Sequence, residues 1–175
     1  MDSALLYAAS VRWLHILAGI VWIGLLYYFN YVQAWSFPKM EAAARANATQ
    51  ILLPRALLWF RWAALVTWLA GVLLIISYAF MIPGYMGSSR FNLILVGGLM
   101  GTIMLVNVWG IIWPNQKRII EATNNTVANA APAPPDQPKW ARRAFLASRF
   151  NTLFSIPLIF FMVAAPPLLG QLATK

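Results

Sequence analysis

Cysteine is absent from the 175 residues, and histidine occurs only once, as His15. Without cysteine the chain can form neither a disulfide nor a thiolate metal site. Acidic residues are also scarce, because only four carboxylates are present and all lie outside the long apolar stretches. A buried carboxylate pair for acid–base catalysis or proton-coupled transport is therefore excluded, and we predict no catalytic residue.

Charge of either sign is low, at 10% of the residues, whereas soluble domains carry about 25%. The net charge is nonetheless +9, because 13 basic residues face four acidic ones. These basic residues cluster at the ends of the apolar stretches, which favours membrane topology over nucleic-acid binding.

Long apolar stretches dominate what is present. About 20 predominantly apolar residues suffice to cross a bilayer as a helix, so we predict an all-α, polytopic integral membrane four-helix bundle in a single domain, 1–175. The predicted spans are 13–35, 56–80, 91–113 and 144–165. We expect a short interfacial helix over 40–53, ended by Pro54, a third span closed by Pro114, and a disordered linker rich in proline and alanine over 130–139.

Basic residues also predict the orientation of the spans. Ten lie in or beside the connections between spans one and two and between spans three and four, and three lie on the opposite side. Because basic loops stay in the cytoplasm, we expect both termini in the periplasm of a bacterial inner membrane.

His15 is the first candidate site. A neutral imidazole can ligate haem iron or another metal, so His15 is a candidate for haem b or metal binding, with Arg12 one turn before it and Gly19 one turn after it. The alternative is a polar residue near the headgroups that hydrogen-bonds to a neighbouring helix. One histidine cannot supply two axial ligands, so a haem would need a second subunit or another ligand type.

A polar layer near the predicted cytoplasmic face is the second candidate. It would bind a quinone headgroup or a small anion, or simply join the helices by hydrogen bonds. All four predicted spans contribute to it, through Asn30, Gln33, Arg61, Asn107, Arg149 and Asn151.

Small residues at four-residue spacing predict helix packing faces. One face is on the second span, with Ala63, Thr67 and Gly71, and the other is on the third span, with Gly97 and Gly101.

Three stretches carry a resemblance to a known family. They are RWLHILAGIVWIGLLYYFNYVQ at 12–33, WPNQ at 113–116 and SRFNTLFSIPLIFFM at 148–162. They resemble the urate oxidase N-terminal family, the membrane domain of bacterial urate hydroxylases. The resemblance implies a redox membrane protein that passes electrons from urate to a cytochrome c, with His15, Arg149 and Asn151 as the matched positions.

The chain also departs from that family. It has no C-x-x-C-H motif, and Phe150 and roughly Ala165 stand where the family carries histidine. We therefore keep two main interpretations open, beside a third and weaker one, a small-molecule transporter that uses the polar layer. The first is a membrane subunit, without complete catalytic machinery, that packs in a homo-oligomer or in a larger respiratory or photosynthetic electron-transfer complex. The second is a urate-hydroxylase-like oxidoreductase that binds haem through His15 and passes electrons to a cytochrome c. Both have the lipid bilayer as a partner and neither binds nucleic acid.

Overall fold

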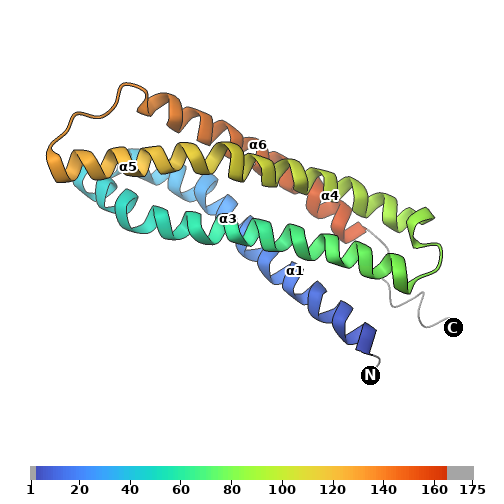
Figure 1. The fold of residues 1–175 in the computed structure, drawn as a ribbon. Coiled ribbons are helices and arrows are strands. Elements are labelled where there is room, and N and C mark those ends of the chain that lie inside the picture. Colours follow the sequence, from blue (N-terminus) through green and yellow to red (C-terminus); the bar gives the residue numbers. More distant parts are fainter. Residues whose placement is uncertain (1–2, 165–175) are drawn as a thin grey trace.

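Four long helical stretches form the fold (Figure 1). The computed structural model describes residues 3–164, and these contain helices, turns and short connections but no strand. Four stretches are long and apolar enough to cross a membrane, namely Ser3–Lys39, Ala42–Met81, Ser89–Asn129 and Gln137–Ala164. The predicted all-α class with four candidate spans is confirmed.

The first stretch changes its helical type near its end. It consists of α1 (Ser3–Tyr27), a π-helical segment η1 (Tyr28–Gln33), α2 (Ala34–Ser36) and a 3₁₀ segment η2 (Phe37–Lys39). The extended backbone of Met40 then separates it from α3 (Ala42–Met81).

Pro54 lies inside α3 and does not end it. The separate interfacial helix predicted over 40–53 is therefore wrong, because residues 42–53 are the first turns of α3 itself. A proline removes one backbone hydrogen bond from the helix. Leu53 and Leu57, on either side of it, are almost fully buried, and their packing keeps the helix continuous.

The third stretch likewise passes through its proline. It comprises α4 (Ser89–Asn107), the π-helical segment η4 (Val108–Ile112) and α5 (Trp113–Asn129), so the prediction that Pro114 closes it is wrong. Proline is tolerated in the first turn of a helix, where its missing N–H is not needed. Pro114 occupies such a position, because α5 begins directly after the wider π-helical turn.

The last helix, α6 (Gln137–Ala164), also begins earlier than expected. Residues 137–139 of the predicted linker belong to it, with Pro138 in the first turn. The end of the predicted fourth span, residue 165, lies outside the described residues. A 3₁₀ turn, η3 (Tyr85–Gly87), links α3 to α4 at the opposite end of the bundle.

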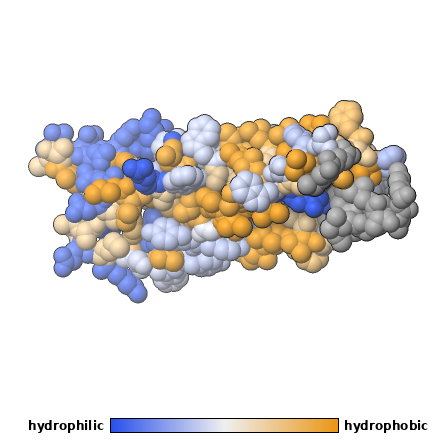
Figure 2. Space-filling model, turned by 90° about the horizontal axis from the view of Figure 1, so that it is seen from below, coloured by the Kyte–Doolittle hydropathy of each residue, from blue (hydrophilic) through white to orange (hydrophobic). Residues whose placement is uncertain are grey.

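The long stretches exceed what a bilayer requires. At 1.5 Å per residue, the 40 residues of α3 extend about 60 Å, twice the thickness of a hydrocarbon core. The excess lies at the end where α5 and α6 meet, and Figure 2 shows hydrophilic residues gathered there and an apolar surface over most of the rest. We call this the basic end, because the basic residues of the connections between spans one and two and between spans three and four lie there.

The helices pair as α1 with α3 and α4 with α6. The main core between them contains Trp22, Leu26, Phe60, Met104 and Val108, all almost fully buried. A second cluster, around Tyr78 and Tyr85, closes the end opposite the basic end.

Candidate functional site

His15 lies in the seam between α1 and α3 and is half-buried. Its Nδ1 is 2.7 Å from the backbone carbonyl oxygen of Thr67. Gly71, one turn further along α3, makes room for the ring, because a Cβ at that position would lie 3.0 Å from Cε1 of His15 and 3.2 Å from Nδ1. The histidine therefore fills a notch left by a glycine.

The contact with Thr67 fixes the chemical form of the ring. A carbonyl oxygen only accepts hydrogen bonds, so Nδ1 carries the proton and donates it to Thr67. In the neutral imidazole, Nε2 then keeps a free lone pair, which is the arrangement found in metal-ligating histidines. Nε2 makes no hydrogen bond within the described residues, so His15 can donate one ligand.

The two residues predicted to assist His15 have other contacts. Arg12 donates from Nε to the hydroxyl of Tyr78 at 3.1 Å, and its guanidinium lies beside the same ring. A Cβ at Gly19 would lie 3.7 Å from Cγ2 of Thr67, so this glycine serves the approach of α1 to α3. Both residues therefore face α3 in the same seam as His15.

Three asparagines of the predicted polar layer join helices. Nδ2 of Asn107 on α4 donates to Oδ1 of Asn151 on α6 at 2.9 Å, and Nδ2 of Asn151 donates to the carbonyl of Met104 at 3.0 Å. Nδ2 of Asn30, in η1, donates to the carbonyl of Leu26 at 2.8 Å and to Oγ of Ser148 at 2.7 Å. Asn30 and Asn151 are almost fully buried, and each connects its own helix to α6 or α4.

Arg61 does not join these amides. Its guanidinium stacks 3.7 Å from the ring centre of Trp113 and 5.9 Å from that of Trp109. Its Nε and one Nη are buried without a hydrogen-bond acceptor, so the aromatic faces are its main partners.

Arg149 and Gln33 also stand apart from the amide pairs. The guanidinium of Arg149 lies 4.9 Å from the ring centre of Phe145, one turn away on α6. Gln33 is half-buried in the wall of the cavity described below. The six residues of the predicted layer therefore do not form one site. The three asparagines join helices, Arg61 and Arg149 lie against aromatic rings, and Gln33 lines the cavity.

The predicted small-residue faces lie in the two helix seams. Ala63 and Thr67 are buried on α3, and Thr67 and Gly71 face α1. On α4, a Cβ at Gly97 would lie 2.7 Å from Cε of Met162 and 3.3 Å from Cβ of Phe161, and one at Gly101 would lie 3.6 Å from Leu158. The side chains of α6 thus rest directly on the two glycines.

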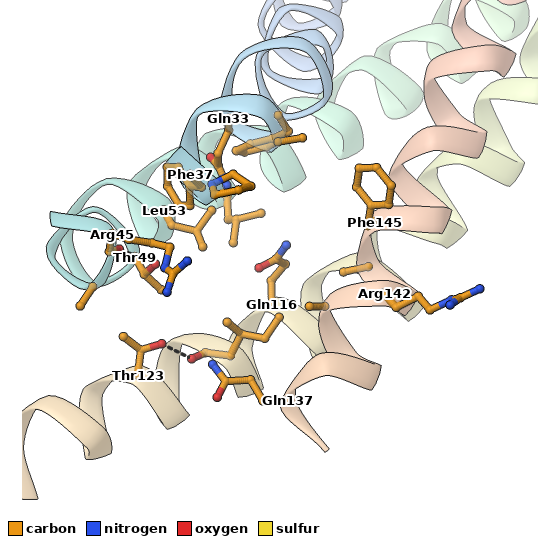
Figure 3. Close-up of a pocket in the computed structure, with 18 of the residues that line it drawn as sticks. Gln33, Phe37, Arg45, Thr49, Leu53, Gln116, Thr123, Gln137, Arg142 and Phe145 are labelled. Atoms are coloured by element: carbon orange, nitrogen blue, oxygen red, sulfur yellow. Dashed lines mark hydrogen bonds between the residues drawn. The ribbon is translucent and has the colours of Figure 1, made fainter. Parts of the chain in front are cut away.

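A cavity of about 660 Å³ opens at the basic end, between η1, η2, α3, α5 and α6 (Figure 3). Its lining is mostly apolar, with Leu53, Leu57 and Ile112 at the inner end. Arg45 and Gln116 point into it, whereas the guanidinium of Arg142 points away. Sequence reasoning missed this cavity because Arg45 and Gln116 lie on segments that were expected to lie outside the bundle.

No group of three or more histidine, cysteine, aspartate or glutamate side chains comes together within residues 3–164. His15 is therefore not part of such a cluster.

Comparison with family models places part of this geometry in a known family. The model described as urate oxidase N-terminal matches residues 85–166. This segment matches the urate oxidase N-terminal family. The match covers α4, η4, α5 and α6, and with them two of the three stretches that suggested the resemblance, 113–116 and 148–162. The resemblance of these stretches is confirmed. Searches among curated proteins and among solved structures give no match.

The urate oxidase N-terminal segment contains only part of the candidate residues. Asn107, Arg149 and Asn151 lie inside it, together with both glycines of the α4–α6 seam. His15 and Asn30 lie outside it, as does the whole α1–α3 seam. The match therefore covers the α4–α6 pair, and the candidate ligand His15 belongs to the α1–α3 pair.

Proposed function

We propose that this chain is an integral membrane subunit that packs through α1 in a homo-oligomer or in a larger respiratory or photosynthetic electron-transfer complex. The supporting observation is the position of α1. Its first half leans away from the other helices and packs chiefly on α3 (Figure 1). Trp13 and Ile20, on its outer side, are 65% and 64% exposed.

A helix in a four-helix bundle normally packs against two neighbours. The first half of α1 has α3 on one side, and the apolar side chains of Trp13, Ile16 and Ile20 cover its outer side. A transmembrane helix of a second subunit supplies the missing neighbour. Because lipid chains can cover the same surface, the test has to distinguish protein from lipid at this position.

Photo-crosslinking in native membranes makes that distinction. We would place p-benzoylphenylalanine at Ile16, and at Leu69 of α3 as a control. Both positions are exposed and lie at a similar depth, since Gly19 contacts Thr67. We expect a protein adduct of larger mass from position 16 only. Lipid adducts alone at position 16, or equal protein adducts at both positions, would overturn the proposal.

The orientation belongs to the same proposal, with both termini in the periplasm of a bacterial inner membrane. The concentration of arginine and lysine at the basic end supports it. Because the chain has no cysteine, single cysteines report the two sides directly. A membrane-impermeant maleimide should label Gly87→Cys in intact spheroplasts and Ala133→Cys only after lysis. The opposite pattern would contradict the orientation.

A second candidate function is haem-mediated electron transfer to a cytochrome c, with His15 as an axial ligand. The proton on Nδ1 favours it, because Nε2 is left free to bind a metal. A second histidine or a cysteine ligand would have to come from a partner, because the chain has one histidine and no cysteine. A bound haem would supply one-electron redox chemistry. His15 would hold it, and the carbonyl of Thr67 would orient the ring.

An absorption spectrum of gently purified protein, oxidised and then reduced, tests this second candidate. We expect a Soret band that shifts on reduction and is lost in His15→Ala. The same band in His15→Ala, or a colourless wild-type protein, would remove His15 from this role.

A further inference from the structure

One residue in the wall of the cavity at the basic end, Asn30, has an unused hydrogen-bond acceptor. Asn30 lines this cavity and is only 1% exposed. Its Nδ2 must face the carbonyl of Leu26, which only accepts, so the orientation of the amide is fixed. The other amide atom, Oδ1, is buried and has no partner. A buried acceptor without a donor is costly, which points to a ligand group that donates to it.

Ser148 adds to this polar point. It lines the same cavity and accepts from Nδ2 of Asn30 through Oγ, so its own hydroxyl hydrogen remains free to donate. An acceptor on Asn30 and a donor on Ser148 therefore lie next to each other. Together they match a hydroxyl group, which both donates and accepts.

The mouth of the cavity carries a positive charge. Arg45 points into it and forms no ion pair among the described residues. None of the acidic side chains within residues 3–164 lines the cavity. An anionic oxygen is the natural partner of a guanidinium without a counter-ion, and Gln116 adds an amide that also points into the cavity (Figure 3).

The rest of the wall is mostly apolar. Phe29, Phe37, Leu53 and Ile112 contribute to it, and the cavity volume of about 660 Å³ is typical of small-molecule sites. A sugar or a free inorganic anion would make no apolar contact with this wall, whereas an aromatic ring would pack against it.

We infer that this cavity binds a hydroxyaryl carboxylate, with the carboxylate at Arg45 and the hydroxyl at Asn30 and Ser148. This site lies away from His15 and from the outer side of α1. It is therefore independent of the subunit proposal and of the haem proposal.

Fluorescent naphthalene probes test the inference on purified protein in nanodiscs. The full probe is 6-hydroxy-2-naphthoate, 2-naphthoate lacks the hydroxyl and 2-naphthol lacks the carboxylate. We expect saturable binding of the full probe, and about tenfold weaker binding of 2-naphthoate because Asn30 is left without a donor. Empty nanodiscs correct for partition into lipid. Removing the donor from the ligand avoids changing Asn30, whose amide also joins η1 to α6.

Variants of two arginines on α3 test the other end of the site. Arg45→Gln should weaken binding of the full probe at least fivefold and leave 2-naphthol unchanged. Arg55→Gln, at an exposed arginine outside the cavity, should leave both unchanged.

Three results would overturn the assignment. One is the absence of saturable binding, which would leave water as the partner of Asn30. Another is equal affinity for the full probe and 2-naphthoate, and the third is an equal loss in Arg45→Gln and Arg55→Gln.

Discussion

The two helix seams of the bundle are built from different chemistry. In the α4–α6 seam, Gly97 and Gly101 let α6 approach closely, and the amides of Asn107 and Asn151 bond to each other. In the α1–α3 seam, a histidine ring occupies the notch at Gly71 and donates to a carbonyl. The first seam uses its polar groups for helix association, whereas the second leaves the lone pair of an imidazole free.

This difference follows the extent of the family match. The urate oxidase N-terminal segment includes all of the α4–α6 seam and none of the α1–α3 seam. Close packing in the first pair therefore provides the scaffold of the matched segment. His15 and the exposed side of α1 lie in the second pair, outside the matched residues.

Filling the α4–α6 seam is expected to lower the free energy of unfolding more than any other substitution below. In Gly97→Leu the new side chain meets Met162 and Phe161, whose atoms lie 2.7 Å and 3.3 Å from the position of the added Cβ. Overpacking of this kind costs about 1–3 kcal/mol. We expect the free energy of unfolding, measured by SDS titration in mixed micelles, to fall by about 3 kcal/mol, the upper end of that range.

Gly98→Leu is the matched control, because a Cβ at Gly98 has nothing within 4 Å. Both substitutions replace a glycine in the same helix, so their effects on helix propensity cancel. Similar losses in the two variants would mean that close contact at Gly97 is not what holds α4 to α6.

A substitution in the α1–α3 seam should change the free energy of unfolding less, and should instead change the environment of His15. In Gly71→Ala the methyl group would lie 3.0 Å from Cε1 of His15, so the ring has to move and its bond to Thr67 weakens. The expected cost, about 1 kcal/mol, is comparable to the gain from replacing glycine by alanine in a helix. We therefore expect little change in stability but a shifted ¹⁵N resonance of His15 Nδ1.

Gly24→Ala sharpens this test, since a Cβ at Gly24 meets nothing within 4 Å. It should raise the free energy of unfolding by about 1 kcal/mol through helix propensity alone. An unchanged Nδ1 resonance in Gly71→Ala would show that His15 does not depend on the notch.

The sequence was sufficient to predict the helices but not where they end. Apolar length alone identifies four candidate spans, because a bilayer demands a continuous apolar helix. Pro54 and Pro114 misled the prediction of boundaries. Helix-breaking is a local property, and packing at Leu53 and Leu57 and the π-helical turn before Pro114 override it. The missed continuity matters, since residues 42–53 and α5 form walls of the cavity.

Side-chain partners were harder to predict. The prediction put Asn30, Arg61 and Asn107 in one layer because they lie at similar depth along their spans. The contacts of a side chain also depend on which way it points around the helix axis, and depth does not give this direction. Arg61 faces tryptophans and Asn107 faces Asn151. The acceptor of His15 is a backbone carbonyl, which leaves no pattern in a sequence. Residues from all four long helical stretches line the cavity, so no single stretch reveals it.

The smallest expected effect on stability is a pH dependence at the end of the α1–α3 seam, where Tyr85 packs edge-on against Tyr78. Burial raises the pKa of Tyr85 above its usual value near 10, and the nearby Arg90 opposes this only in part. The unfolded chain therefore loses this proton at a lower pH than the folded chain. Stability from Tyr85 is complete below pH 10 and declines as the pH rises toward the folded pKa. We expect the melting temperature in detergent to fall between pH 9 and pH 11, and to fall less in Tyr85→Phe. If both proteins lose the same amount, the hydroxyl of Tyr85 titrates as freely in the folded chain as in the unfolded one, and this end of the seam is more open than the α4–α6 seam.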